Sequence, residues 1–219
     1  MARKRFTDDE REQRREDILD SAMAVFEKHG GLEALSFRKL ASEMGLSYSA
    51  PYRYFRDKDE LVNALRVRAY RWIEAEMRTA IEGRKSPEAK LEALASAYVT
   101  SGLQRPQRYA LLFFNLDDTD LARHSLELRA AKHDALDICT QVIAEGQQSG
   151  ELPSHLDPLT ASHLFWIGAH GLVSLELAGQ FAMGRDVDAL IPIVIHTLRA
   201  GMYQETENAH GQVRMRVSL

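Results

Sequence analysis

Hydroxyl, phenol and cationic side chains gather between residues 36 and 58 of the sequence. They are Ser36, Arg38, Ser47, Tyr48, Ser49, Tyr52, Arg53, Tyr54 and Lys58. Side chains of these types donate hydrogen bonds to phosphate oxygens, and a short helix that carries them can enter the major groove of DNA, which is about 12 Å wide. The segment therefore predicts a nucleic-acid interface, with Ser36, Arg38 and Lys58 placed to hold the DNA backbone.

Two of these residues also have a plainer interpretation. Tyr52 could pack as an ordinary core aromatic, and Lys58 could begin a solvated helix face. We favour DNA contact for Tyr52 because the helix that carries it is short and polar.

Patterns typical of catalysis are missing from the sequence. It contains no HExxH, no GxSxG, no P-loop and no GxGxxG after a strand. Its histidines do not cluster with acids at the spacing of metal ligands. The chain is therefore expected to be no enzyme and to need no cofactor or metal.

The elements that position the polar segment follow from helical periodicity, since no stretch alternates apolar and polar residues as a strand does. The pattern predicts helices over residues 11–29, 36–44 and 49–55, with the turn Gly45-Leu46-Ser47 between the last two. A helix, a short glycine-containing turn and another short helix form a helix-turn-helix. A long fourth helix begins near Asp57, with an inward stripe of Leu61, Leu65, Ala69, Trp72 and Ile73.

The rest of the sequence also predicts helices. One of them begins at Pro87, and the others cover about residues 107–114, 121–145, 157–181 and 186–203. Pro192 is expected to kink the last helix or to mark its start. The expected fold class is all-α: an N-terminal three-helix helix-turn-helix module joined by a long helix to a C-terminal helical ligand-binding and dimerisation domain. The expected boundaries are 1–58 for the DNA-binding domain, 59–205 for the second domain and 206–219 for a flexible tail.

One combination of residues is more specific than any of its parts. It consists of Ala24-Val25-Phe26, Gly30, Ser36, Arg38, Leu40-Ala41, Gly45-Leu46-Ser47, Tyr52-Arg53-Tyr54-Phe55, Lys58 and Leu61. This run, about residues 14–62, resembles the DNA-binding module of the TetR family of transcriptional regulators. The family more often has histidine at the position of Tyr54, and both side chains donate hydrogen bonds.

The resemblance implies specific roles. Ser36, Tyr52, Tyr54 and Lys58 are expected at the DNA backbone, and Ser47, Tyr48 and Ser49 near base edges or phosphates. It also implies a regulator, by family default a repressor, that binds a palindromic operator in double-stranded DNA as a homodimer and is released by a small ligand. The helices over about residues 158–181 and 186–203 are the expected dimer interface.

The C-terminal part offers a weaker resemblance. Trp166 is followed four residues later by His170-Gly171 and then by an apolar stretch with Glu176. This arrangement is similar to the WHG-type C-terminal domain of some TetR regulators. The residues expected to line a pocket for a small, mostly apolar ligand are Tyr109, Phe113, Phe114, Trp166, His170 and Met183. Ordinary core packing remains open for each of them, and His170 in particular fits a hydrogen-bonded core histidine.

Charge and cysteine content are compatible with this interpretation. The net charge is −4, but residues 1–72 hold 15 basic and 13 acidic side chains, against 13 and 19 in the remainder. A weakly basic head on an acidic body suits a DNA-reading module carried by a larger domain. One cysteine and a charged N-terminus without an apolar run are typical of a cytoplasmic protein without a membrane span.

A second function class stays open beside the regulator. A helical adaptor that had lost DNA binding would have the same helices, but it would not be expected to keep the polar side chains over residues 47–54.

Overall fold

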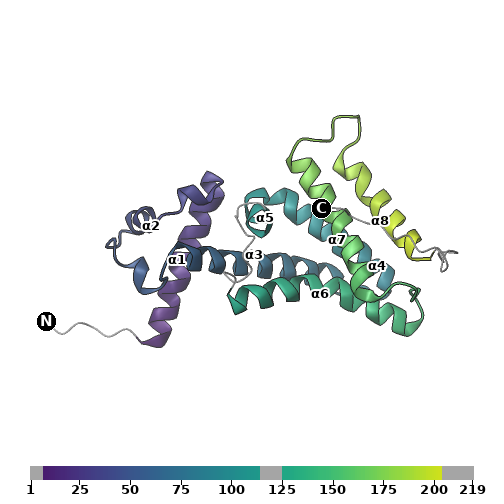
Figure 1. The fold of residues 1–219 in the computed structure, drawn as a ribbon, viewed down its shortest axis with the longest axis horizontal. Coiled ribbons are helices and arrows are strands. Elements are labelled where there is room, and N and C mark those ends of the chain that lie inside the picture. Colours follow the sequence, from purple (N-terminus) through teal and green to yellow (C-terminus); the bar gives the residue numbers. More distant parts are fainter. Residues whose placement is uncertain (1–6, 114–124, 204–219) are drawn as a thin grey trace, which may run out of the picture.

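The computed structural model describes residues 7–113 and 125–203, and this part of the chain consists of helices and loops without strands (Figure 1). Its α-helices are α1 (Asp8–His29), α2 (Phe37–Glu43), α3 (Lys58–Ile81), α4 (Pro87–Gln104), α5 (Pro106–Phe113), α6 (Leu126–Ser149), α7 (Pro158–Leu177) and α8 (Val187–Tyr203). Two short 3-10 helices, η1 (Leu32–Ala34) and η2 (Pro51–Arg53), precede and follow α2. The predicted all-α class is confirmed.

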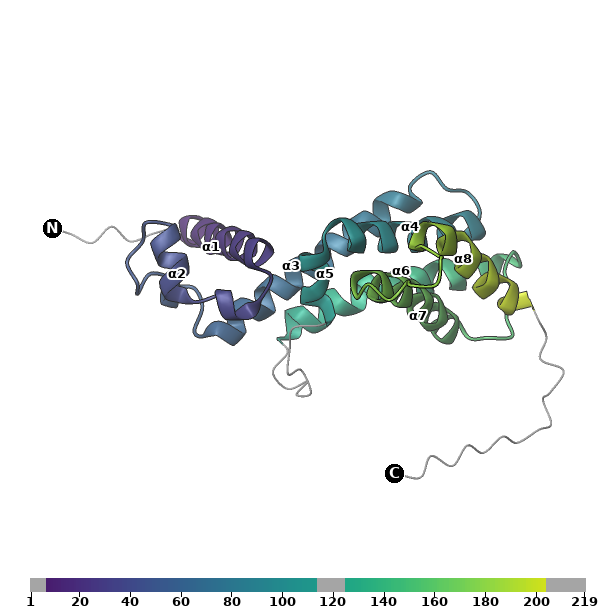
Figure 2. The ribbon, with the colours of Figure 1, turned by 90° about the horizontal axis from the view of Figure 1, so that it is seen from above.

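The molecule is elongated, with a head and a body. Figures 1 and 2 show α1 and α2 at one end, α4 to α8 at the other, and α3 running from the head into the body. The fully buried side chains Phe26, Leu40, Phe55 and Leu61 come from the head helices, the loop before α3 and the first turn of α3. Because α3 contributes to the cores of both parts, a tilt of this helix moves the head relative to the body.

Local caps explain where the head helices begin. Thr7 and Glu10 form a reciprocal capping box at the start of α1, which satisfies backbone N–H groups that have no partner within the helix. Ser36 caps α2 by accepting a hydrogen bond from the backbone nitrogen of Lys39 at 3.2 Å. Asp57 does the same for α3, accepting from the nitrogen of Glu60 at 2.9 Å.

The predicted third helix is shorter and tighter than expected. The prediction was an α-helix over residues 49–55, whereas the structure has the 3-10 helix η2. The amides of Ala50 and Arg53 bond to carbonyls three residues earlier, those of Ser47 and Ala50. Pro51 has no N–H and cannot close an α-type bond to Ser47, which favours the tighter turn.

The body packs α3, α4, α6 and α7 together, with α8 on the outside of α7 (Figure 1). Gly168 permits a close approach of the last two helices, because a Cβ at this position would lie 2.7 Å from Cδ1 of Leu198. None of the helices in the described ranges is long and apolar enough to cross a membrane.

The structure bears on three predicted boundaries in the body, and one of them, the end of α7, differs from the prediction. α7 ends at Leu177 instead of continuing to Phe181, because Gly179 turns the chain with a positive φ of 64°. α6 begins behind the cap Ser125, and the predicted start near residue 121 lies outside the described residues. Pro192 lies inside α8 and does not mark its start.

Candidate functional site

The predicted DNA-contacting side chains form an exposed surface on the head. Tyr48 and Tyr52 are each 61% exposed, which is unusual for large aromatics. Ser36, Arg38, Ser47, Ser49, Arg53 and Lys58 are exposed as well, and Tyr54 is half-buried against the core. The fold therefore brings the predicted set to the end of the molecule farthest from the body.

Contacts within this surface hold its aromatic rings in place. The ring of Tyr52 meets that of Phe37 edge-on, with centroids 4.5 Å apart, so its body is anchored while it stays largely exposed. The guanidinium of Arg38 lies 5.5 Å from the ring centre of Tyr48. The hydroxyls of Ser47 and Ser49 lie 3.4 Å apart.

Lys58 has a position that its sequence context did not indicate. Its Nζ donates to the backbone oxygen of Leu32 at 2.5 Å, which fastens the start of α3 to η1. An ammonium carries three donors, so this bond leaves two for a phosphate. The structural role and the predicted DNA role are therefore compatible.

A chain of buried polar groups crosses the body between α4, α5 and α7. Nε1 of Trp166 donates to the hydroxyl of Tyr98 at 3.1 Å, and that hydroxyl lies 3.1 Å from the hydroxyl of Tyr109. The hydroxyl of Tyr109 lies 2.6 Å from Nδ1 of His170. Nε2 of His170 lies 3.3 Å from the hydroxyl of Ser174. Each buried polar group named here thus has a hydrogen-bond partner.

Burial changes the ionisation of these groups. Desolvation raises the pKa of Tyr98 to about 12 and raises the pKa of Tyr109 as well, so both phenols stay protonated. Desolvation lowers the pKa of His170, which favours the neutral imidazole. One nitrogen of a neutral imidazole is a hydrogen-bond acceptor, so Nδ1 of His170 can accept a hydrogen bond from the hydroxyl of Tyr109.

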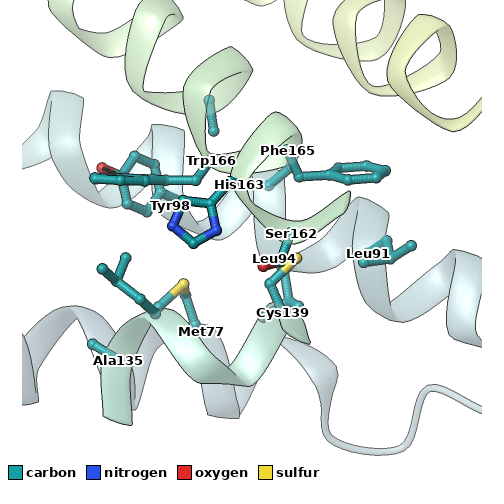
Figure 3. Close-up of a pocket in the computed structure, with 13 residues that line it drawn as sticks. Met77, Leu91, Leu94, Tyr98, Ala135, Cys139, Ser162, His163, Phe165 and Trp166 are labelled. Atoms are coloured by element: carbon teal, nitrogen blue, oxygen red, sulfur yellow. Dashed lines mark hydrogen bonds between the residues drawn. The ribbon is translucent and has the colours of Figure 1, made fainter. Parts of the chain in front are cut away.

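A mainly apolar cavity of about 60 Å³ lies beside this polar chain, between α3, α4, α6 and α7. Figure 3 shows Phe165, Trp166 and His163 of α7 opposite Ala135 and Cys139 of α6. The lining residues are Met77, Leu91, Leu94, Ala95, Tyr98, Ala135, Leu136, Cys139, Ser162, His163, Phe165, Trp166 and Ala169. Burial raises the pKa of the Cys139 thiol to about 12, so this thiol is protonated and contributes apolar surface.

The predicted ligand set only partly coincides with this lining. Trp166 lines the cavity, whereas Tyr109, Phe113 and His170 pack against one another next to it, with 4.5 Å between the ring centres of Phe113 and His170. The prediction that Met183 lines the pocket is wrong, because its side chain is 96% exposed in the loop between α7 and α8. Phe114 lies outside the described residues.

The lining residues from α3, α4 and α6 were not predicted from the sequence. Met77, Leu94 and Leu136 have no feature that separates them from core residues at the same helical spacing. His163 carried a usable signal, since a histidine three residues before Trp166 shares its helix face.

Charged side chains connect the head to the body. Arg68 of α3 bonds to Asp20 of α1 at 2.6 Å and also contacts the carboxylate of Glu16. Arg108 of α5 donates through Nε to Glu27 of α1 at 2.8 Å. α5 thus contacts α1 through Arg108. The next residue, Tyr109, belongs to the row of hydrogen-bonded polar groups in the body.

Comparison with known proteins bears on both parts. The family described as "Bacterial regulatory proteins, tetR family" matches residues 18–65, and "Tetracyclin repressor-like, C-terminal domain" matches residues 91–198. The chain belongs to the TetR family of transcriptional regulators. The predicted membership, the helix-turn-helix for DNA binding and the absence of an enzymatic role are thereby confirmed, while the WHG-type subgroup stays a prediction.

Individual proteins are similar to this chain in sequence and in fold. The HTH-type transcriptional regulator Rv0681 of Mycobacterium tuberculosis is 25% identical over 197 residues, which cover 90% of this chain and 84% of the relative. A protein of Rhodococcus sp. RHA1 has a similar structure, with a TM-score of 0.77, 28% identity and coverage of 87% of this chain and 95% of that one. The regulator FadR of Bacillus subtilis, solved in complex with stearoyl-CoA, has a TM-score of 0.70 at 21% identity, with coverage of 86% and 99%.

Proposed function

We propose that this TetR regulator is a cytoplasmic repressor that binds a palindromic operator as a homodimer and leaves it when a small, mostly apolar ligand occupies the body. The observation that carries the proposal is the pair of neighbours Arg108 and Tyr109 on α5. Arg108 bonds to Glu27 in the head, and Tyr109 bonds to His170 beside the cavity.

The DNA side of the proposal rests on the exposed surface of the head. Tyr52, Tyr54, Lys58 and Ser36 are assigned to the DNA backbone. Ser47, Tyr48 and Ser49 are assigned to base edges or phosphates, with Arg38 and Arg53 beside them. Phosphate contacts set the position of the head, and contacts to base edges set its sequence preference.

The dimer is supported by apolar side chains on the outer surfaces of α7 and α8. Leu164 (43%), Ile167 (62%), Leu175 (45%) and Ile193 (56%) are exposed in the single chain. Two copies of α7 and α8 that pack as a four-helix bundle would cover these side chains. A two-fold dimer presents two heads to two half-sites about 34–36 Å apart, which doubles the contacts to DNA.

Ligand release follows from the packing around α5. A cavity of about 60 Å³ is smaller than the roughly 300–1,000 Å³ of typical small-ligand sites, so a ligand must displace lining side chains. Displacing Trp166 strains its hydrogen bond to Tyr98, and Tyr98 is linked through Tyr109 to α5. A shift of α5 moves Arg108 against α1, which changes the spacing of the two heads.

The test uses DNA fragments selected by the full-length protein from a genomic library. Operator affinity is measured by fluorescence anisotropy with and without two probes that share a ten-carbon alkyl chain, 1-decanol and decanoate. Coupling of roughly 1–3 kcal/mol predicts a 5–150-fold loss of operator affinity with a bound probe, and operator must weaken probe binding by the same factor. Failure to select any fragment contradicts the DNA role, and a bound probe that leaves operator affinity unchanged contradicts ligand release.

A further inference from the structure

A groove of about 310 Å³ on the surface of the body adjoins the apolar cavity. Its walls come from α6 and from the start of α7, and Leu136 and His163 line both the groove and the cavity. The remaining lining residues are Arg129, Lys132, His133, Asp137, Thr140 and Leu159. A ligand that enters the cavity between these two helices therefore has its other end in the groove.

Three of the side chains that line the groove are basic. Arg129, Lys132 and His133 follow one another at i, i+3 and i+4 on α6, so their side chains share one face of the helix. Within the described residues, neither Arg129 nor Lys132 forms an ion pair, and His133 lies 3.3 Å from Asp134. Arg129 and Lys132 thus line the groove without an ion-pair partner among the described residues.

The carboxylate in the groove lining offsets one of these two positive charges and leaves the other. Asp137 is the groove's carboxylate, and its Oδ2 accepts a hydrogen bond from Nε2 of Gln141 at 2.8 Å. Nδ1 of His163 lies 2.7 Å from the backbone oxygen of Leu159 and therefore donates to it. The other nitrogen of this imidazole, Nε2, remains for a ligand at the junction of groove and cavity.

The cavity offers the opposite chemistry. Its walls are mostly aliphatic and aromatic, and two of its polar members, Ser162 and Trp166, form hydrogen bonds within the protein. The hydroxyl of Ser162 accepts from Thr140 at 2.8 Å and donates to the oxygen of Leu159 at 2.9 Å. The flexible side chain of Met77 on the α3 side can change rotamer and admit an alkyl chain.

We infer that the ligand of this site is an amphipathic anion, with an apolar chain in the cavity and a carboxylate or phosphate group at Arg129 and Lys132. This inference rests on the proposed function only for its regulatory consequence, since binding can be measured without DNA. It narrows the ligand from a mostly apolar molecule to one with a negatively charged end.

The test compares probe molecules that have the same alkyl chain and different polar end groups. Decanoate and 1-decanol are titrated into the full-length Trp72→Phe variant, in which Trp166 in the cavity wall is the remaining tryptophan. Decanoate is expected to bind about tenfold more tightly than 1-decanol, because charged hydrogen bonds contribute more than neutral ones. Decanoyl-CoA forms a third arm: tighter binding than decanoate assigns the groove to a phosphate-bearing head, and weaker binding assigns it to a free carboxylate.

A matched pair of double variants tests where the charged end of the ligand binds. Arg129→Gln with Lys132→Gln should remove the preference for decanoate and leave 1-decanol affinity unchanged. Arg84→Gln with Lys85→Gln makes the same charge change in the exposed turn between α3 and α4 and should retain the preference. The inference is overturned if decanoate does not bind, if it binds no better than 1-decanol, or if both double variants lose the preference equally.

The outcomes separate this inference from the proposed function. If the two probes bind equally and both release the operator, the inference of a negatively charged ligand is wrong, and the proposal of ligand release still holds. Preferential decanoate binding that does not change operator affinity supports the amphipathic ligand and contradicts ligand release.

Discussion

Arg108 of α5 and Glu27 of α1 form an ion pair at 2.7 Å at the place where the head meets the body. The guanidinium of Arg108 also lies 5.4 Å from the ring centre of Trp72 on α3. This one side chain of α5 thereby contacts two other helices, α1 and α3.

The first prediction concerns the stability of this pair. Arg108→Gln and Glu27→Gln are each expected to lower the free energy of unfolding by about 1 kcal/mol, because both side chains are less than one-third exposed. The double variant should cost less than the two single variants together, since each single change already removes the pair. Urea unfolding of the four proteins measures the cycle.

The control is the pair of Arg78 and Glu74 within α3, where the arginine side chain is 51% exposed. The same cycle on this pair should give a coupling below about 0.5 kcal/mol. Equal couplings for the two pairs would show that Arg108 does not hold the head to the body.

The second prediction is a pH dependence that arises from His170. Desolvation lowers the pKa of this imidazole in the folded protein, so below about pH 6.5 the unfolded state binds more protons than the folded state. The stability contributed by neutral His170 is therefore present above about pH 6.5 and lost as the pH falls. His170→Gln should flatten the dependence of the unfolding free energy between about pH 7.5 and 5.5.

An exposed histidine provides the comparison. His155→Gln, in the loop between α6 and α7, should retain the wild-type loss of stability on acidification. An unchanged slope in His170→Gln would mean that another group is responsible for the acid sensitivity.

The helices and their order could be predicted from the sequence because caps and apolar stripes are local signals. Ser36 and Asp157 cap the helices whose predicted ranges begin with them, and Ser86 caps the helix that was expected to begin at Pro87. The 3-10 form of η2 was not predicted, although Pro51 carried the reason for it. Periodicity detects that a segment is helical, but the missing N–H of a proline decides how tightly it winds.

The candidate site was less accessible to sequence reasoning. Tyr109, Phe113, Trp166 and His170 were predicted together and lie close together, with three of them in a packed cluster and Trp166 facing the cavity. Their contact with a ligand stays a prediction. Met183 was placed with them by its residue type alone, and it lies exposed in a loop. The other walls of the cavity come from α3, α4 and α6, whose tertiary packing no local pattern records.

The third prediction concerns the dimer. Ile167→Glu is expected to convert a micromolar dimer to a monomer, because the side chain is 62% exposed in the single chain and a carboxylate buried at an interface is strongly unfavourable. Light scattering coupled to gel filtration measures the mass. Leu126→Glu makes the same kind of change at a side chain that is 77% exposed on α6 and should leave the dimer intact. A wild-type monomer at micromolar concentration would contradict the proposed assembly.

The last prediction tests how the head contacts DNA. The Tyr52 ring is held edge-on against Phe37 while the side chain remains 61% exposed, so Tyr52→Phe removes a hydroxyl and keeps the packing. Lys58→Ala removes an ammonium that bonds to Leu32 and is assigned to phosphate. Both variants should weaken operator binding without changing the preferred base sequence, because phosphate contacts carry no sequence information.

Salt dependence separates these two changes. Lys58→Ala should lower the slope of log affinity against log salt by about one unit per half-site, because one fewer counterion is released. Tyr52→Phe removes no charge and should leave the slope unchanged. Lys85→Ala, in the exposed turn between α3 and α4, is the control for a lost surface cation and should alter neither affinity nor slope. A changed base preference with an unchanged slope in Lys58→Ala would place this residue at a base edge and overturn its assignment to the backbone.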